Sequence, residues 1–146
     1  MQQVLPEKPS DSQFDEKKRK LDILVVDDDE AARSTLAEML ETQAHHVISV
    51  SSGKEALNMI GSRHFDIVFT DLGMPGMSGW EVSQEIKKRS PATHIIMITG
   101  WGTQLDQQKA SETGIRKILP KPVSCDEIID AVRGCKIAIF RLILGE

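Results

Sequence analysis

The chain is 146 residues long, which is enough for one domain with a modest tail but too short for two full domains. Its formal charge of −4 argues against a general nucleic-acid binder, because neutralising phosphates requires a basic face. No apolar stretch approaches the roughly 20 residues needed to cross a bilayer, so we expect no membrane insertion.

The N-terminal segment, residues 1–20, is polar and charged, and we predict that it is a flexible leader or an interdomain linker. The folded domain is expected over residues 21–140, followed by a C-terminal tail over residues 141–146. Residues 137–144 are more apolar than a last helix requires. They form either the rest of that helix or a contact surface for a neighbouring domain or a second subunit.

Short apolar runs alternate with helical patterns from Leu21 onward, which is typical of a parallel sheet wrapped by helices. Strands are predicted at residues 23–26, 47–50, 67–70, 95–98 and 118–120. Capping patterns predict helix starts at Ser52 with Glu55, Ser78 with Glu81, Thr103 with Asp106, and Ser124 with Glu127. The sequence therefore predicts an α/β, flavodoxin-like doubly wound (βα)5 fold, with a five-stranded parallel sheet of order 2-1-3-4-5.

The two cysteines lie on the last predicted helix, at Cys125 and Cys135. Their separation along a helix is about 15 Å, which a disulfide cannot span. We therefore expect reduced thiols and a cytoplasmic protein.

Polar side chains follow four of the predicted strands. Asp27 and Asp28 follow the first strand, while Asp71, Thr99 and Lys121 follow the third, fourth and fifth strands. In an open α/β sheet, ligands bind beyond the carboxyl ends of the strands, where the strand order reverses. Carboxylates, a hydroxyl and an ammonium gathered at that edge predict a metal-assisted phosphoryl-transfer site.

Three ionised carboxylates at this edge would repel one another by roughly 4 kcal/mol per pair at about 4 Å. A divalent cation removes this conflict, and all-oxygen ligands favour Mg²⁺, with Mn²⁺ as the alternative. The carbonyl of Gly73, in the glycine-rich loop after Asp71, could reach the ion. The predicted metal ligands are therefore Asp27, Asp28, Asp71 and Gly73.

Asp71 is the best candidate for a nucleophile, because it stands alone on its strand and leaves Asp27 and Asp28 to hold the metal. Lys121 can supply positive charge to the transferred phosphoryl group, and Thr99 can supply a hydroxyl donor. A cis peptide bond before Pro122 would aim Lys121 into the site.

Four motifs together carry a resemblance to a known family. They are Val-Val-Asp-Asp-Asp at 25–29, Asp-Leu-Gly-Met-Pro-Gly-Met-Ser-Gly-Trp at 71–80, Ile-Thr-Gly at 98–100 and Lys-Pro at 121–122. With them, the chain resembles a response-regulator receiver domain of the CheY-like family across roughly residues 21–139. The resemblance implies either a stand-alone regulator or the terminal receiver of a hybrid sensor kinase working in a phosphorelay.

The resemblance also implies the residue roles. Asp71 matches the phosphoacceptor, and Asp27 and Asp28 match the acidic pair that holds Mg²⁺. Thr99 matches the switch hydroxyl, and Lys121 matches the lysine that contacts the phosphoryl group. The donor in this family is a histidine kinase or a phosphotransfer domain, and phosphorylation changes the face formed by helix four, strand five and helix five. The expected output is contact with an unknown protein effector, with a possible homodimer through that face.

Two positions depart from the family pattern. Ile118 replaces the aromatic residue that often precedes the lysine by three positions, which suggests an altered output face. Trp101 lies two positions after Thr99, where the residue influences hydrolysis of the phosphoryl group. Our hypothesis is that Trp101 screens attacking water, and an unchanged dephosphorylation rate in Trp101→Ala would contradict it.

Three other functions compete with a receiver. A Mg²⁺-dependent phosphohydrolase normally has an Asp two residues after its nucleophile, but Gly73 holds that place. A flavodoxin-like FMN binder needs a Gly-rich or Ser/Thr-rich first loop, whereas this loop is Asp-rich. A scaffold that has lost phosphorylation is disfavoured because the full residue set is present. We therefore expect a phosphoacceptor that promotes only its own phosphorylation and dephosphorylation, and not an enzyme.

Overall fold

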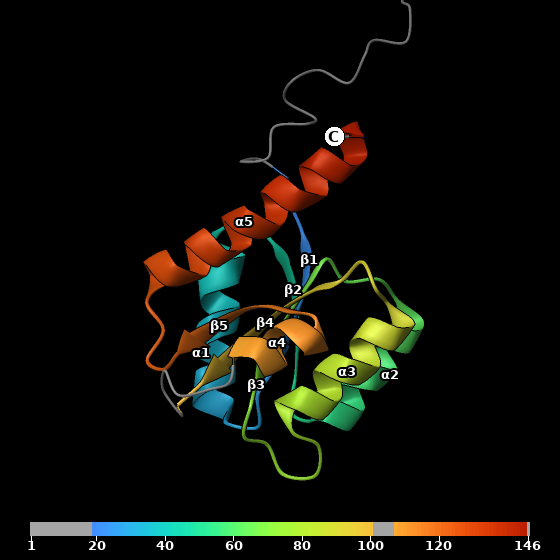
Figure 1. Cartoon of the computed structure of the whole chain (residues 1–146). Helices are drawn as coiled ribbons and strands as arrows, with labels where there is room; N and C mark the ends of the chain where they lie inside the picture. The colour runs from blue at the N-terminus through green and yellow to red at the C-terminus, as the bar shows by residue number, and fades with distance from the viewer. Residues whose placement is uncertain (1–18, 101–106, 146) are drawn as a thin grey trace, which may run out of the picture.

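The computed structural model describes residues 19–100 and 107–145 (Figure 1). Within these residues, five parallel strands form one sheet of order β2-β1-β3-β4-β5, as the sequence predicts. The strands are β1 (Asp22–Val26), β2 (His46–Val50), β3 (Ile67–Asp71), β4 (His94–Thr99) and β5 (Ile115–Pro120). The helices are α1 (Glu30–Thr42), α2 (Gly53–Ser62), α3 (Gly79–Arg89), α4 (Gln107–Thr113) and α5 (Cys125–Leu144). The predicted doubly wound fold is confirmed.

The apolar side chains of the strands alternate between two core clusters, one on each face of the sheet. The first cluster contains Leu24 of β1 and Val68 of β3, and it is covered by α2, α3 and α4. The second contains Ile23 and Phe69 from the same strands, and it is covered by α1 and α5 (Figure 1). Burial on both faces explains why the inner strands are continuously apolar. The edge strand β2 is instead partly exposed.

Three of the four predicted capping patterns begin helices in the structure. Ser52, Ser78 and Ser124 are the N-caps of α2, α3 and α5, and the last two form complete capping boxes. In each case the Ser side chain accepts a hydrogen bond from a backbone N–H in the first helical turn, which would otherwise lack a partner. The fourth pattern, Thr103 with Asp106, lies outside the described residues.

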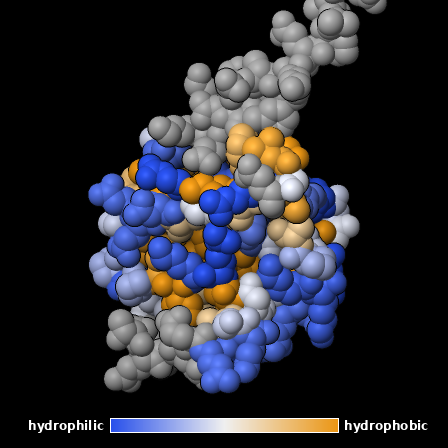
Figure 2. Space-filling model, turned by 45° about the horizontal axis from the view of Figure 1, so that its top comes forward, coloured by the Kyte–Doolittle hydropathy of each residue, from blue (hydrophilic) through white to orange (hydrophobic). Residues whose placement is uncertain are grey.

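Helix α5 is the longest described helix and continues to Leu144. Its last turn carries three exposed apolar side chains, Leu142, Ile143 and Leu144, and Figure 2 shows hydrophobic side chains gathered there. Cys125 and Cys135 are free thiols on this helix, as expected. Cys125 is exposed and Cys135 is buried. None of the helices in the described part of the chain is long and apolar enough to span a bilayer.

His45 makes the stability of this fold depend on pH. Its side chain is buried, and Nδ1 accepts a hydrogen bond from the backbone N–H of Leu21 at 3.1 Å. Burial first, and then the charge of Lys136, lowers the pKa of His45 from 6.5 to about 4. Between these values the folded chain binds fewer protons than the unfolded chain. The contribution of neutral His45 to the free energy of unfolding is therefore complete above pH 6.5, and it is lost as the pH falls towards 4.

We expect the free energy of unfolding to be about 2 kcal/mol lower at pH 5 than at pH 7.5 on account of His45. Urea titrations at both pH values measure this difference. The same titrations on His45→Gln should show a difference that is smaller by this amount, because glutamine keeps a hydrogen-bond acceptor that does not titrate. The part that remains belongs to other groups such as His94, whose pKa is also lowered by burial. An identical pH dependence in both chains would show that another group is responsible.

Candidate functional site

The register of the sheet brings the predicted site residues to one edge. Val26 pairs with Thr70, Asp71 with Ile98, and Thr99 with Pro120. Asp27, which follows β1, therefore lies level with Asp71, and Lys121 follows β5 two residues beyond the level of Asp71, at the same edge of the sheet. The carboxyl ends of four strands thus meet as the sequence predicts.

Asp27 is fixed by several hydrogen bonds. Its backbone N–H donates to the carbonyl of Val50 at 3.2 Å, and its Oδ1 accepts from the backbone N–H of Asp29 at 2.9 Å. Asp29 in turn is the N-cap of α1, where its Oδ1 accepts from the backbone N–H of Ala31. Asp28 lies between them and is exposed. The three consecutive aspartates therefore have three different surroundings.

Lys121 joins two of the carboxylates. Its Nζ lies 3.3 Å from Oδ2 of Asp27 and 3.2 Å from Oδ1 of Asp71. Its backbone N–H donates to the carbonyl of Thr99 at 2.8 Å, and the peptide bond to Pro122 is cis, as expected. Burial works against the charge of the ammonium, but Asp27 and Asp71 together outweigh it and raise the pKa of Lys121.

Asp71 is buried, with an exposed fraction of 9%. Burial first, and then the charge of Asp27, raises the pKa of Asp71, while Lys121 opposes the rise. Carboxylate oxygens of Asp27, Asp28 and Asp71 all lie within 4.8 Å of one another. Close hard oxygen ligands with excess negative charge suit a divalent cation such as Mg²⁺. The residues present therefore fit the predicted metal.

The other predicted residues have more varied settings. Thr99 is fully buried at the end of β4, where it pairs with Pro120, the residue before Lys121. Gly73 is exposed in the loop between β3 and α3, and its role as a carbonyl ligand stays a prediction. Ile118 is half-buried and packs against the first core cluster. Trp101, with its predicted effect on hydrolysis, lies outside the described residues.

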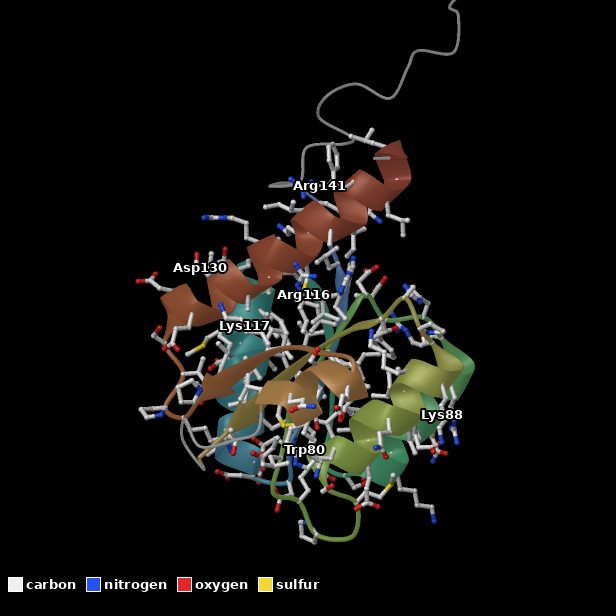
Figure 3. All side chains as sticks on the ribbon, in the orientation of Figure 1. Trp80, Lys88, Arg116, Lys117, Asp130 and Arg141 are labelled. Atoms are coloured by element: carbon white, nitrogen blue, oxygen red, sulfur yellow. The ribbon has the colours of Figure 1, made fainter. Side chains whose placement is uncertain are left out.

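Two contacts near the site were not anticipated from the sequence. Trp80, near the start of α3 (Figure 3), packs against the first core cluster. The ammonium of Lys109 from α4 lies 4.9 Å from the centre of its ring. Arg33, on α1, donates a hydrogen bond from Nη1 to the carbonyl of Asp27 at 2.9 Å. The sequence does place Arg33 one helical turn after the N-cap of α1, on the helix that follows the acidic turn (residues 27–29). That spacing is the one sequence feature from which its contact with this turn could have been predicted.

A groove of about 500 Å³ opens beside the carboxylate cluster. Its apolar lining comes from Leu36 and Met39 of α1 and from Val123 after β5. Asp27 and Lys121 also line it. The groove therefore reaches Asp27 and Lys121, although Asp28 and Asp71 are not among the residues that line it.

Comparisons with known proteins agree with this geometry. A family model for the response regulator receiver domain matches residues 23–133. The chain is 34% identical over 106 residues to the sensor histidine kinase RcsC of Escherichia coli K12, covering 73% of this chain and 11% of that protein. It is 36% identical over 111 residues to the probable transcriptional regulator ycf27 of Guillardia theta, covering 76% of this chain and 43% of that protein.

A solved structure gives the same result. The receiver domain protein from Clostridium thermocellum is 30% identical, with a TM-score of 0.78, and the match covers 84% of this chain and 98% of that one. By contrast, the chain spans less than half the length of the two curated relatives. The match to them is therefore a match to one domain. The chain belongs to the response regulator receiver domain family of two-component signal transduction, whose domains are phosphoacceptors.

Proposed function

We propose that this receiver accepts a phosphoryl group on Asp71 in a Mg²⁺-dependent reaction and that this changes a protein-binding face. The observation that carries the proposal is the placement of the Lys121 ammonium between Asp27 and Asp71, beside the exposed Asp28. A cation at this point neutralises the charge on a transferred phosphoryl group. An ordinary surface ion pair would not need three converging carboxylates.

In the proposed reaction, a carboxylate oxygen of Asp71 attacks the phosphorus atom of the donor and forms a new P–O bond. The bond between phosphorus and the donor breaks, and the donor keeps the electron pair and takes up a proton. Lys121 and the hydroxyl of Thr99 stabilise the phosphoryl oxygens. Mg²⁺, when bound by Asp27, Asp28 and Asp71 with the carbonyl of Gly73, supplies further positive charge to those oxygens.

The phosphoryl donor in this proposal is a sensor histidine kinase or a phosphotransfer domain. The groove between α1 and the β5–α5 connection supports this choice, because it leads to Asp27 and Lys121 and has an apolar wall for a docked helix. The match to a receiver within a sensor histidine kinase supports a phosphorelay, and the match to a transcriptional regulator supports a response regulator. Both arrangements use the same site.

The proposed output is a protein contact through the face formed by α4, β5 and α5, with no nucleic acid involved. The exposed Leu142, Ile143 and Leu144 at the end of α5 support a contact there, including the predicted homodimer. Sedimentation velocity before and after phosphorylation tests the homodimer, and a monomer under both conditions would contradict it. The cytoplasmic location stays a prediction.

Intact mass spectrometry after incubation with acetyl phosphate tests the proposed function. We expect one added phosphoryl group in the presence of Mg²⁺ and none when EDTA removes the metal. An unmodified chain in both samples would contradict the proposal. Sustained release of inorganic phosphate without a modified chain would instead indicate the phosphohydrolase, which we disfavour because Gly73 replaces its general acid.

A further inference from the structure

Arg33 links helix α1 to the acidic turn in two ways. Its backbone N–H donates to the carbonyl of Asp29 at 2.9 Å, which is the first hydrogen bond of the helix. Its side chain, which is half-buried, turns back and donates from Nη1 to the carbonyl of Asp27 at 2.9 Å. A charged donor makes this hydrogen bond stronger than one between neutral groups. The start of the helix and the acidic turn are therefore held together by one residue.

The carbonyl that Arg33 holds belongs to the peptide group between Asp27 and Asp28. A peptide group is planar, so fixing its oxygen also fixes the direction in which the chain continues to the next Cα atom. The position of the exposed Asp28 depends on this plane, because its Cα atom is the next one in the chain. Asp27 has further supports at Val50, Asp29 and Lys121. Loss of the Arg33 bond should therefore affect Asp28 more than Asp27.

We infer that Arg33 is a positioning residue, which orients the peptide between Asp27 and Asp28 and thereby holds the Asp28 carboxylate ready for a divalent cation. This inference rests on the proposed function. Arg33 acts through the carbonyl of Asp27 and not directly on Asp71. The charges that shift the pKa of Asp71 are those of Asp27, Lys121 and Asp28, and Arg33 is not among them. The expected signature is therefore weaker metal binding, with little change in the chemical step.

Mn²⁺ binding followed by electron paramagnetic resonance tests this inference, with Mg²⁺ added as the competitor. We expect Arg33→Met to weaken binding of both ions about 10-fold, as is typical when a group that orients a metal ligand is lost. Arg33→Lys should recover part of the affinity, because an ammonium can still donate to the carbonyl. In acetyl phosphate assays, the Mg²⁺ concentration for half-maximal rate should rise about 10-fold, while the maximal rate changes less than about threefold.

Arg63→Met is the matched control. Arg63 forms an ion pair with Asp22 at 3.0 Å, at the opposite end of β1, so its loss removes an arginine contact from the same strand without touching the acidic turn. We expect its Mn²⁺ affinity to equal that of the native chain. Circular dichroism and urea titration establish whether each variant is folded. If Arg33→Met does not fold, the Mn²⁺ affinity of Arg33→Lys is compared with that of the native chain instead.

The outcomes separate this inference from the proposed function. If the native chain binds Mn²⁺ and accepts the phosphoryl group, but the Arg33 variants bind Mn²⁺ as tightly as it does, the positioning role is overturned and the proposed function stands. If the native chain neither binds Mn²⁺ nor becomes phosphorylated, both are overturned. An equal loss of affinity in Arg63→Met would show a general loss of stability and would also overturn the positioning role.

Discussion

Replacing Asp71 with asparagine is expected to abolish phosphorylation of this chain. Asparagine has nearly the same shape as aspartate, so the packing of the buried side chain should be retained. Its amide, however, is not a nucleophile for phosphorus and carries no charge for Lys121 or a metal. After incubation with acetyl phosphate and Mg²⁺, intact mass spectrometry should show one added phosphoryl group in the native chain and none in Asp71→Asn.

Asp29→Asn is the matched control for this substitution. Asp29 is the last of the three consecutive aspartates, and its side chain caps α1. Asparagine caps helices as well as aspartate does, so the helix should be retained. We expect Asp29→Asn to be phosphorylated to the same extent as the native chain. A phosphoryl group that still appears on Asp71→Asn would place the acceptor elsewhere.

Among the described glycines near the site, Gly79 is the one whose replacement by alanine should lower the free energy of unfolding most. The first residue of α3 packs directly on the end of β3, where its N–H donates to the carbonyl of Leu72 at 2.8 Å. A Cβ atom at Gly79 would overlap the carbonyl oxygen of Asp71 and would lie 2.9 Å from Cα of Leu72. Both are backbone atoms, so α3 and the end of β3 must move apart. We expect a loss of about 3 kcal/mol in the free energy of unfolding.

The same displacement moves the backbone of Asp71, so we also expect slower phosphorylation of Gly79→Ala. Urea titration measures the free energy of unfolding, and intact mass spectrometry over time measures the rate of phosphorylation. Gly61→Ala serves as the control, because Gly61 lies in α2 with no atom within 4 Å of the added carbon. The free energy of unfolding of Gly61→Ala should rise by about 0.5–1 kcal/mol, because alanine is more favourable than glycine inside a helix. Equal stability of the two variants would contradict the steric argument.

The sequence predicts the sheet and the main site residues because both depend on local signals. The inner strands are short runs of buried apolar residues, such as residues 67–70, and each is followed by a polar residue at the same edge. Once the order of the strands is predicted, the meeting of Asp27, Asp71 and Lys121 follows from topology alone. The capping patterns at Ser78 and Ser124 likewise involve only neighbours in sequence.

Side-chain contacts across elements could not be predicted in this way. Arg33 has five donors and a long side chain, and its choice of the Asp27 carbonyl depends on how α1 leaves the turn. The sequence predicts Asp27 and Asp28 as metal ligands, but it does not reveal that Asp29 caps α1, because any of the three aspartates is suited to capping. The low pKa of His45 depends on burial between α1 and α5, which are far apart in the chain.

The sheet that separates the two core clusters also separates the groove beside Asp27 from the surroundings of Ile118. The groove beside Asp27 has its wall on the side of α1 and α5, whereas Ile118 packs on the side of α2, α3 and α4. Substitutions in the wall of the groove therefore leave the packing around Ile118 intact, so each side of the sheet can be redesigned without disturbing the other.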